Sequence, residues 1–135
     1  MHCPCGSGRL YDVCCKPFHQ GKLPEHAVLL MRSRYAAYAC NLPEYIIRTT
    51  HPKNPRYNPD FVQWSRDISA FCLETEFQKL EILESQETGS VATVVFVAHL
   101  MQNGKDVSFT EKSNFEKIKD RWLYRGGQRV EDRAG

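Results

Sequence analysis

The sequence predicts an α+β protein in which helices come first and an antiparallel sheet follows. Two observations support this prediction. Between residues 25 and 75 the apolar residues recur at helical spacing, and from Glu76 onward they alternate with polar residues, as in strands with one buried face. Helices followed by a run of strands are typical of α+β folds, in which the helices cover one face of the sheet.

The composition fits one globular domain with a short additional module. The chain has 135 residues, of which 41% are hydrophobic and 25% charged. Its formal charge is only +2, so charge does not support a general nucleic-acid or membrane role. No apolar run approaches the roughly 20 residues of a membrane span, and no apolar signal region opens the chain. We therefore expect a cytoplasmic protein with reduced thiols.

The first fifteen residues hold four of the six cysteines. These are Cys3, Cys5, Cys14 and Cys15. Four sulfur ligands at one point suit a closed tetrahedral zinc site, whose local fold depends on the metal. Gly6-Ser7-Gly8 can turn tightly between the pairs, and residues 9–13 can form about one helical turn that returns the second pair. The spacing alone also allows a disulfide-linked tip or an iron–sulfur cluster.

The first two helices are predicted from periodicity and from residues typical of helix ends. Residues 25–40 form the first helix. Its buried face consists of Val28, Met31, Tyr35 and Tyr38. A short second helix follows, with Asn41 and Glu44 as a capping box at its start and His51-Pro52 beyond its end.

The third helix is predicted to begin after Asn58, whose side chain can cap it, with Pro59 in the first turn. Its buried face consists of Phe61, Trp64, Ile68, Phe71 and Cys72. Cys72, like Cys40 in the first helix, is expected to be a core residue and not a nucleophile.

Four strands are expected after the helices. They cover about residues 76–86, 90–102, 105–117 and 120–126, and the first joint is placed at residues 87–89. The Asn103-Gly104 pair favours a two-residue type I′ turn. This turn sets the register of its hairpin, so that Phe96 faces Glu111 and Val94 faces Ser113 on the side that the helices cover.

The string Cys3-Pro4-Cys5-Gly6-Ser7-Gly8, followed by Tyr11 and then Cys14-Cys15, resembles the SEC-C motif. SEC-C is a small zinc-binding module best known from the tail of the protein-export ATPase, where it contacts an export chaperone. The resemblance implies a module at residues 1–20 that holds one structural zinc ion per chain through the four cysteines. A closed set of four ligands leaves no open position for catalysis.

Nearly the whole chain also resembles the YchJ-like family of bacterial proteins. The likeness rests on residues 26–38, on His51-Pro52 and on the strand from Phe109 to Phe115. It implies a nuclear-transport-factor-2-like (cystatin-like) domain at residues 25–127, a cone of sheet closed by helices with a pocket inside. Some relatives carry a second SEC-C motif at the C-terminus, whereas residues 128–135 contain no cysteine and are expected to form a flexible tail.

Glu111 is a carboxylate on the apolar inner face of the predicted sheet, where an unpaired charge is costly. We expect a structural ion pair with Arg34 or Arg32 of the first helix, or with His51. A ligand pocket around Glu111 stays open as the alternative. Its candidate residues are Arg34, Tyr35, Tyr38, His51, Trp64, Phe96, Glu111 and Ser113.

These features predict two alternative functions. The first is a non-catalytic, cytoplasmic zinc-binding adaptor whose metal-holding tip contacts another protein. The second is a small-molecule-binding protein, hydrolase or isomerase that uses the cone pocket, since such folds host both enzymes and binders. Nucleic-acid binding has less support, because only Arg9, Lys16 and Lys22 lie near the tip. The sequence identifies neither the partner nor the ligand.

Overall fold

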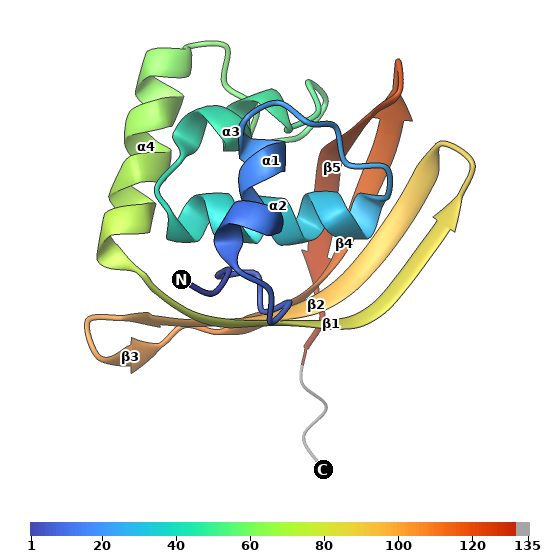
Figure 1. Cartoon of the computed structure of the whole chain (residues 1–135). Coiled ribbons are helices and arrows are strands. Elements are labelled where there is room, and N and C mark those ends of the chain that lie inside the picture. The colour runs from blue at the N-terminus through green and yellow to red at the C-terminus, as the bar shows by residue number, and fades with distance from the viewer. Residues whose placement is uncertain (132–135) are drawn as a thin grey trace.

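The computed structural model describes residues 1–131, which form a twisted antiparallel sheet with helices packed on one of its faces (Figure 1). The leader contains a 3-10 turn, η1 (Tyr11–Val13), and the short helix α1 (Lys16–His19). The three main helices are α2 (Ala27–Ala39), α3 (Pro43–Arg48) and α4 (Phe61–Glu74). The strands are β1 (Glu76–Thr88), β2 (Val91–Gln102), β3 (Lys105–Asp106), β4 (Phe109–Ile118) and β5 (Arg121–Arg129). This order confirms the predicted α+β fold.

The sheet is an antiparallel meander with the strand order β1-β2-β4-β5, and the short β3 pairs with β2. The predicted hairpin register is confirmed, because Phe96 pairs with Glu111 and Val94 with Ser113. Asn103 and Gly104 both have positive φ, as a type I′ turn requires. The prediction of one continuous strand at 105–117 is wrong, because the hydroxyl of Ser108 accepts the hydrogen bond from the N–H of Leu100 and interrupts the strand between β3 and β4.

Two strand ends differ from the prediction. The first hairpin loop is Gly89-Ser90 and not residues 87–89, because Thr88 still pairs with Val91. Strand β5 continues to Arg129, which pairs with Glu111, so the first residues of the expected tail belong to the sheet. The remainder of that tail, from residue 132, lies outside the described residues.

The core lies between the helices and the even-numbered side chains of β2. Ala92, Val94, Phe96, Ala98 and Leu100 are all buried, whereas the residues between them are half-buried. Helix α2 crosses this face, and its Leu30 is fully buried. The segment after α3 covers the free edge of β5, because the Tyr124 N–H donates to the Thr49 carbonyl and the His51 N–H donates to the Tyr124 carbonyl.

Two predicted helix caps differ from those in the structure. The capping box at Asn41 is wrong, because Asn41 adopts a positive φ of 55° and α3 begins after Leu42 with no side-chain cap. The cap of α4 is Asp60, whose side chain accepts the N–H of Gln63, while the Asn58 side chain accepts the N–H of Asp60. The chain therefore enters α3 one residue later, and α4 two residues later, than predicted.

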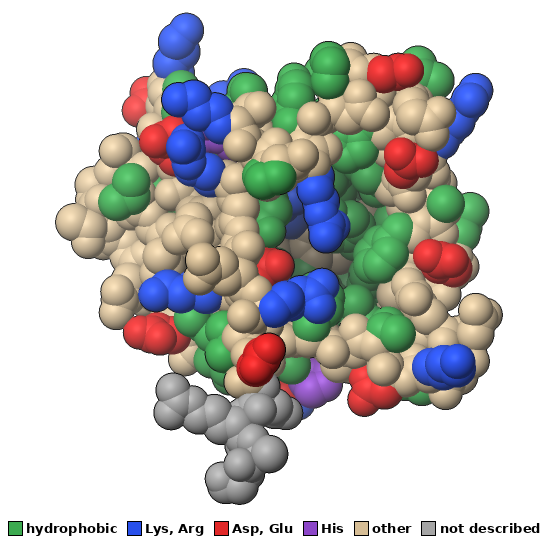
Figure 2. Space-filling view, turned by 180° about the vertical axis from the view of Figure 1, so that it is seen from behind, with side chains coloured by type: hydrophobic (Ala, Val, Ile, Leu, Met, Phe, Trp, Pro, Cys, Tyr) green, Lys and Arg blue, Asp and Glu red, His purple; other side chains and the backbone are tan. Residues whose placement is uncertain are grey.

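The predicted buried face of α4 is confirmed for Trp64, Ile68 and Cys72 but not for Phe61. Phe61 is 49% exposed because it stands at the first residue of the helix, beyond the edge of the core. No helix within residues 1–131 is long and apolar enough to cross a membrane. Over the described residues visible in Figure 2, acidic and basic side chains are interspersed, so this face carries no extended surface of one charge.

Glu87, at the end of β1, caps helix α2 from a distant part of the sequence. Its Oε1 accepts the N–H of Ala27 at 3.0 Å, and its Oε2 lies 3.1 Å from Nδ1 of His26. Burial alone would raise the pKa of this carboxyl, but the bonds from Ala27 and His26 lower it below its ordinary value of 4.5. The ionised form is therefore favoured in the folded protein.

Replacement of Glu87 by alanine should lower the free energy of unfolding by about 1 kcal/mol at pH 7, as for the loss of other helix N-caps. Because folding lowers this pKa, the contribution of the charge is complete above pH 4.5 and is lost as the pH falls through the folded-state value. Urea unfolding of the variant and of wild type at pH 7 and pH 3.5 checks this. Glu84→Ala on the same strand is the control, and equal losses in the two variants would contradict the assigned cap.

Candidate metal centre

The structure brings the four cysteines of the leader together. The sulfur atoms of Cys3, Cys5, Cys14 and Cys15 all lie within 4.8 Å of one another. The first pair sits on a tight hairpin, in which the Cys3 N–H donates to the Arg9 carbonyl at 2.8 Å and Gly6 and Gly8 have positive φ. The 3-10 turn at Tyr11–Val13 then returns the chain, so that the second pair faces the first.

The spacing of the sulfurs fits a single metal ion. A tetrahedral zinc ion with bonds of about 2.3 Å places its sulfur ligands about 3.8 Å apart. The Sγ atoms of Cys5 and Cys14 are 3.6 Å apart, and all six cysteines of the chain are free. Ser7 lies with its hydroxyl 3.1 Å from the Cys14 sulfur, where it can donate a hydrogen bond to a thiolate. These donors could hold a metal ion.

Charge within the cluster also favours a cation. Burial raises the pKa of Cys3 to about 11. A hydrogen bond between the Cys15 and Cys5 sulfurs lowers the pKa of Cys5 to about 4 and raises the pKa of Cys15. One thiolate therefore forms easily and opposes the formation of others beside it. A divalent cation at the centre would offset this repulsion.

The leader is docked on helix α2 and strand β1. Ala36 of α2 is fully buried and packs with the cysteines. Arg32 of α2 donates from Nη1 to the carbonyl of Cys5 at 2.9 Å. At Gly6 a Cβ would lie 3.2 Å from the carbonyl oxygen of Leu80, and the φ of 79° also favours glycine there. The cysteine cluster is therefore fixed relative to the sheet.

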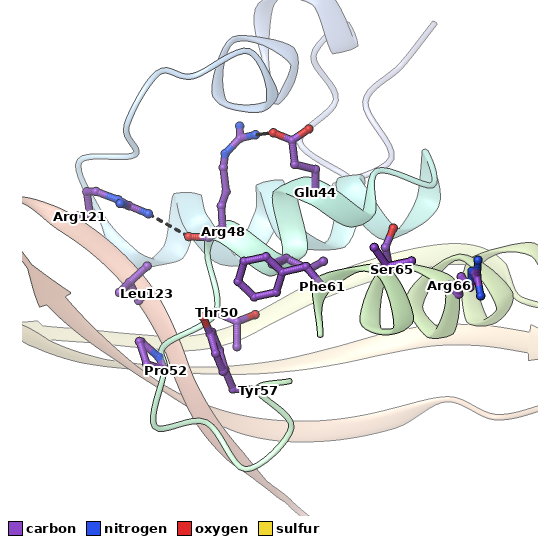
Figure 3. A pocket seen from close by; sticks show the side chains of 12 residues that line it. Glu44, Arg48, Thr50, Pro52, Tyr57, Phe61, Ser65, Arg66, Arg121 and Leu123 are labelled. Atoms are coloured by element: carbon purple, nitrogen blue, oxygen red, sulfur yellow. Dashed lines mark hydrogen bonds and ion pairs between the residues drawn. The ribbon is translucent and has the colours of Figure 1, made fainter. Parts of the chain in front are cut away.

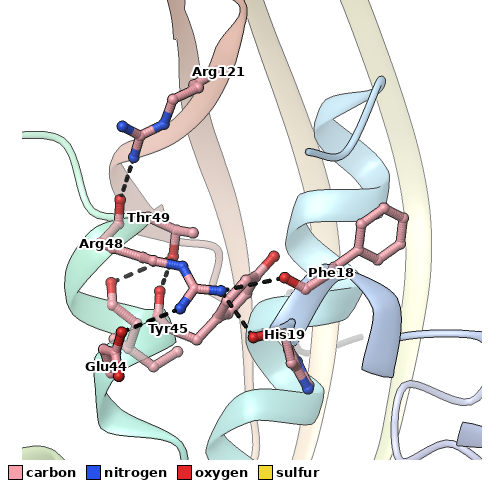
Figure 4. Close-up of polar contacts among 8 residues, drawn as sticks. Phe18, His19, Glu44, Tyr45, Arg48, Thr49 and Arg121 are labelled. Carbon is pink, nitrogen blue, oxygen red and sulfur yellow. Dashed lines mark hydrogen bonds and ion pairs between the residues drawn. The ribbon is translucent and has the colours of Figure 1, made fainter. Parts of the chain in front are cut away.

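Helix α1 extends this docking through His19 and Arg48 (Figure 4). Nε2 of His19 donates to the carbonyl of Ser33 at 2.8 Å, and Nδ1 accepts from the hydroxyl of Tyr11 at 2.7 Å. Burial lowers the pKa of His19, and both its nitrogens are engaged, so it is not a fifth metal ligand. Nη2 of Arg48 donates to the carbonyls of Phe18 and His19. The sequence does not reveal the contact of His19 with Ser33 or those of Arg48 with α1, because the partners are 14 to 30 positions apart.

The expected ion pair of Glu111 is wrong. Oε2 of Glu111 accepts hydrogen bonds from the hydroxyls of Ser113 and Tyr124. The side chain is also covered by β5, because a Cβ at Gly127 would lie 2.5 Å from that oxygen. Two neutral donors next to the carboxylate thus replace the predicted cation.

The three residues considered as partners of Glu111 have other roles. Arg34 is buried, its guanidinium lies over the Tyr124 ring, and its Nη1 donates to neutral acceptors at the end of α3. These acceptors are the carbonyl of Ile46 and the hydroxyls of Thr49 and Thr50. Arg32 bonds to the leader, and Nε2 of His51 donates to Glu116 at 2.6 Å. Acceptors closer in space than Glu111 therefore satisfy each of these donors.

The residues predicted to line a cone pocket fall into separate groups. Arg34, Glu111 and Ser113 share one group of contacts around Tyr124, whereas His51 lies with Glu116. The aromatic members pack edge-to-face against neighbouring rings in or beside the core. They are Tyr35, Tyr38, Trp64 and Phe96.

Two cavities are lined by other residues. A cavity of about 720 Å³ lies between α3, α4 and the start of β5, and we call it the α3–α4 groove (Figure 3). A cavity of about 320 Å³ lies beside α1 and contacts Phe18, Tyr45 and Trp122. Neither lining includes any of the eight residues predicted for the cone pocket.

Comparisons with known proteins agree with the fold and with the cysteine cluster. The family model described as YchJ, middle NTF2-like domain, matches residues 26–127. The UPF0225 protein YchJ of Shigella dysenteriae is 34% identical over 133 residues, which cover 94% of this chain and 82% of that protein.

Two solved structures resemble the whole chain. A SEC-C motif containing protein from Rhodopseudomonas palustris is 37% identical, with a TM-score of 0.84 over 97% of this chain and 100% of that one. A second SEC-C motif containing protein, from Psychrobacter arcticus, is 25% identical, with a TM-score of 0.75 over 98% of this chain and 84% of that one.

Proposed function

The chain belongs to the YchJ family, with a nuclear-transport-factor-2-like domain behind a SEC-C type leader, and we propose that it is a cytoplasmic zinc-binding adaptor with no reaction of its own. The observation that carries this proposal is the cluster of four cysteine sulfurs within 4.8 Å. Four thiolates complete the coordination of a zinc ion, so the metal would stabilise the leader and would not activate water.

Zinc suits the cluster better than the alternatives that the spacing left open. The cysteines of an iron–sulfur cluster bind different iron atoms and therefore stand farther apart than ligands of one ion. Disulfides would need an oxidising compartment, and all four cysteines are free in the structure. One zinc ion uses all four sulfurs at the separation observed between Cys5 and Cys14.

The surface beside the metal cluster suits a protein partner. Met1, Leu10 and Val13 are exposed apolar residues, and we call them the tip surface. Hydrogen bonds hold them close together, since the Tyr11 N–H donates to the Met1 carbonyl and the Val13 N–H donates to the Leu10 carbonyl. Exposed apolar side chains on a rigid support are typical of interaction sites. The metal would supply the rigidity that this short segment lacks.

An adaptor is favoured over a ligand pocket around Glu111. Oε2 of that carboxylate is occupied by Ser113 and Tyr124, and neither described cavity has Glu111 in its lining. The three residues of the tip surface, by contrast, are each more than half exposed.

A Leu10→Asp, Val13→Asp variant should lose bound partners while keeping its metal, because it changes the tip surface and no cysteine. Affinity capture from lysate with this variant, wild type and a Cys14→Ser, Cys15→Ser variant checks the prediction. The proteins recovered with wild type should fall at least about tenfold with both variants, as for the loss of a buried interface anchor. The zinc content of each sample shows whether a variant loses its partners through the changed surface alone or through loss of the metal.

Cys40→Ser is the control, since Cys40 lies outside the cluster. Partners that remain bound to all of the variants would disprove the adaptor role of the tip.

A further inference from the structure

The α3–α4 groove has an apolar floor that is open to solvent. Ile47, Tyr57, Phe61 and Leu123 contribute apolar surface to it, and Val62 stands at its rim. Phe61 and Val62 are the first two residues of helix α4 and line the groove. Their side chains are 49% and 65% exposed. The volume of about 720 Å³ lies within the range of small-molecule sites.

The groove also carries an excess of positive charge. Arg48, Arg66 and Arg121 line it against a single acidic residue, Glu44, which lies 3.6 Å from Arg48. Figure 3 shows Arg121 and Arg66 on either side of Phe61. Charged groups thus stand at both ends of the apolar floor.

Two of these arginines keep free hydrogen-bond donors. One nitrogen of Arg121, Nη2, donates to the carbonyl of Arg48, which orients the guanidinium and leaves its other N–H groups available. Within residues 1–131, Arg66 makes no side-chain hydrogen bond or ion pair. Arginine binds carboxylates through paired N–H donors, which add geometric specificity to the attraction between the charges.

We propose that the α3–α4 groove binds a small amphipathic organic acid, with an aryl or alkyl body on the floor and the carboxylate on Arg66 or Arg121. The apolar floor and the flanking cations together match a ligand of this kind. A phosphate at the start of α4 is disfavoured, because the Asp60 carboxylate already accepts the N–H of Gln63 there. This site is separate from the metal cluster and from Glu111.

The probe for this proposal is 1-anilinonaphthalene-8-sulfonate, a fluorescent aryl anion. Wild type should enhance its fluorescence at micromolar protein, and an Arg66→Gln, Arg121→Gln variant should bind it about tenfold or more weakly. Val62→Asp should weaken binding as well, by placing a negative charge at the rim. The competitor 4-phenylbutyrate should displace the dye, whereas the uncharged 4-phenylbutanol should not.

The matched control is Lys105→Gln, Lys112→Gln, which removes the same charge from exposed sites outside the groove. It should bind the dye within about twofold of wild type, with unchanged thermal unfolding in every variant. The proposal would be overturned if the arginine and lysine double variants weakened dye binding equally. It would also be overturned if 4-phenylbutanol displaced the dye as well as 4-phenylbutyrate does. Displacement by an acidic peptide such as Glu-Leu-Phe-Glu but not by 4-phenylbutyrate would also overturn it, in favour of a protein partner.

Discussion

Replacement of Cys5 by serine should abolish zinc binding and unfold the first twenty residues, while the sheet stays folded. Cys5 is fully buried in the cluster, and a serine hydroxyl is a far weaker zinc ligand than a thiolate. Structural zinc contributes about 10–16 kcal/mol to the folding of small zinc modules, so the leader has no comparable source of stability once the ion is lost. Its regular elements are one β-bridge between His2 and Leu10, one 3-10 turn and a helix of four residues.

Elemental analysis and amide hydrogen exchange together measure this effect. Wild type should hold one zinc ion per chain, and Cys5→Ser should hold none and lose protection at residues 1–20. Protection of β2 and β4 should persist, because the main core consists of residues outside the cysteine cluster. Cys40→Ser should match wild type in zinc content. A Cys5→Ser protein with one tightly bound zinc ion would contradict the assigned ligand set.

Leu30→Ala should destabilise the whole domain by about 2–5 kcal/mol, because it removes a side chain with no exposed surface from the first turn of α2. Leu30 packs between the sheet and the residues beside α1, so the remaining cavity cannot collapse without moving either of them. A loss of this size is a large fraction of the 5–15 kcal/mol typical of a domain.

Leu73→Ala in α4 is a closely matched control. It makes the same chemical change in a helix, but Leu73 is 77% exposed. The expected loss there is below about 0.5 kcal/mol. Urea unfolding of both variants, with zinc present, gives the two free energies. Losses of similar size would contradict the placement of Leu30 in the core.

The features that were predicted correctly depend on residues close together in the sequence. Asn103-Gly104 requires only two adjacent residues to form a type I′ turn, and that turn then sets the pairing of β2 with β4 for eight residue pairs. The close approach of Cys3 and Cys5 to Cys14 and Cys15 likewise depends on a hairpin and one turn within fifteen residues.

The features that were missed depend on contacts between distant segments. Glu87 caps α2 across 60 positions, and no local motif marks it as a cap. Glu111 was expected to need a cation because it stands on the apolar inner face of the sheet, but two hydroxyls satisfy it, and one of them comes from Tyr124 of the next strand. The α3–α4 groove was not predicted, since three separate segments form it.

The sequence by itself determined the order of helices and strands, the register of the central hairpin and the four candidate metal ligands, because periodicity, turn residues and ligand spacing act over short distances. Only the tertiary structure decided where the leader docks, which acceptors satisfy Arg34, and which side chains meet in the groove. These outcomes depend on which surfaces face each other after folding, and side-chain hydrogen bonds form with the nearest acceptor in space, whatever its position in the chain.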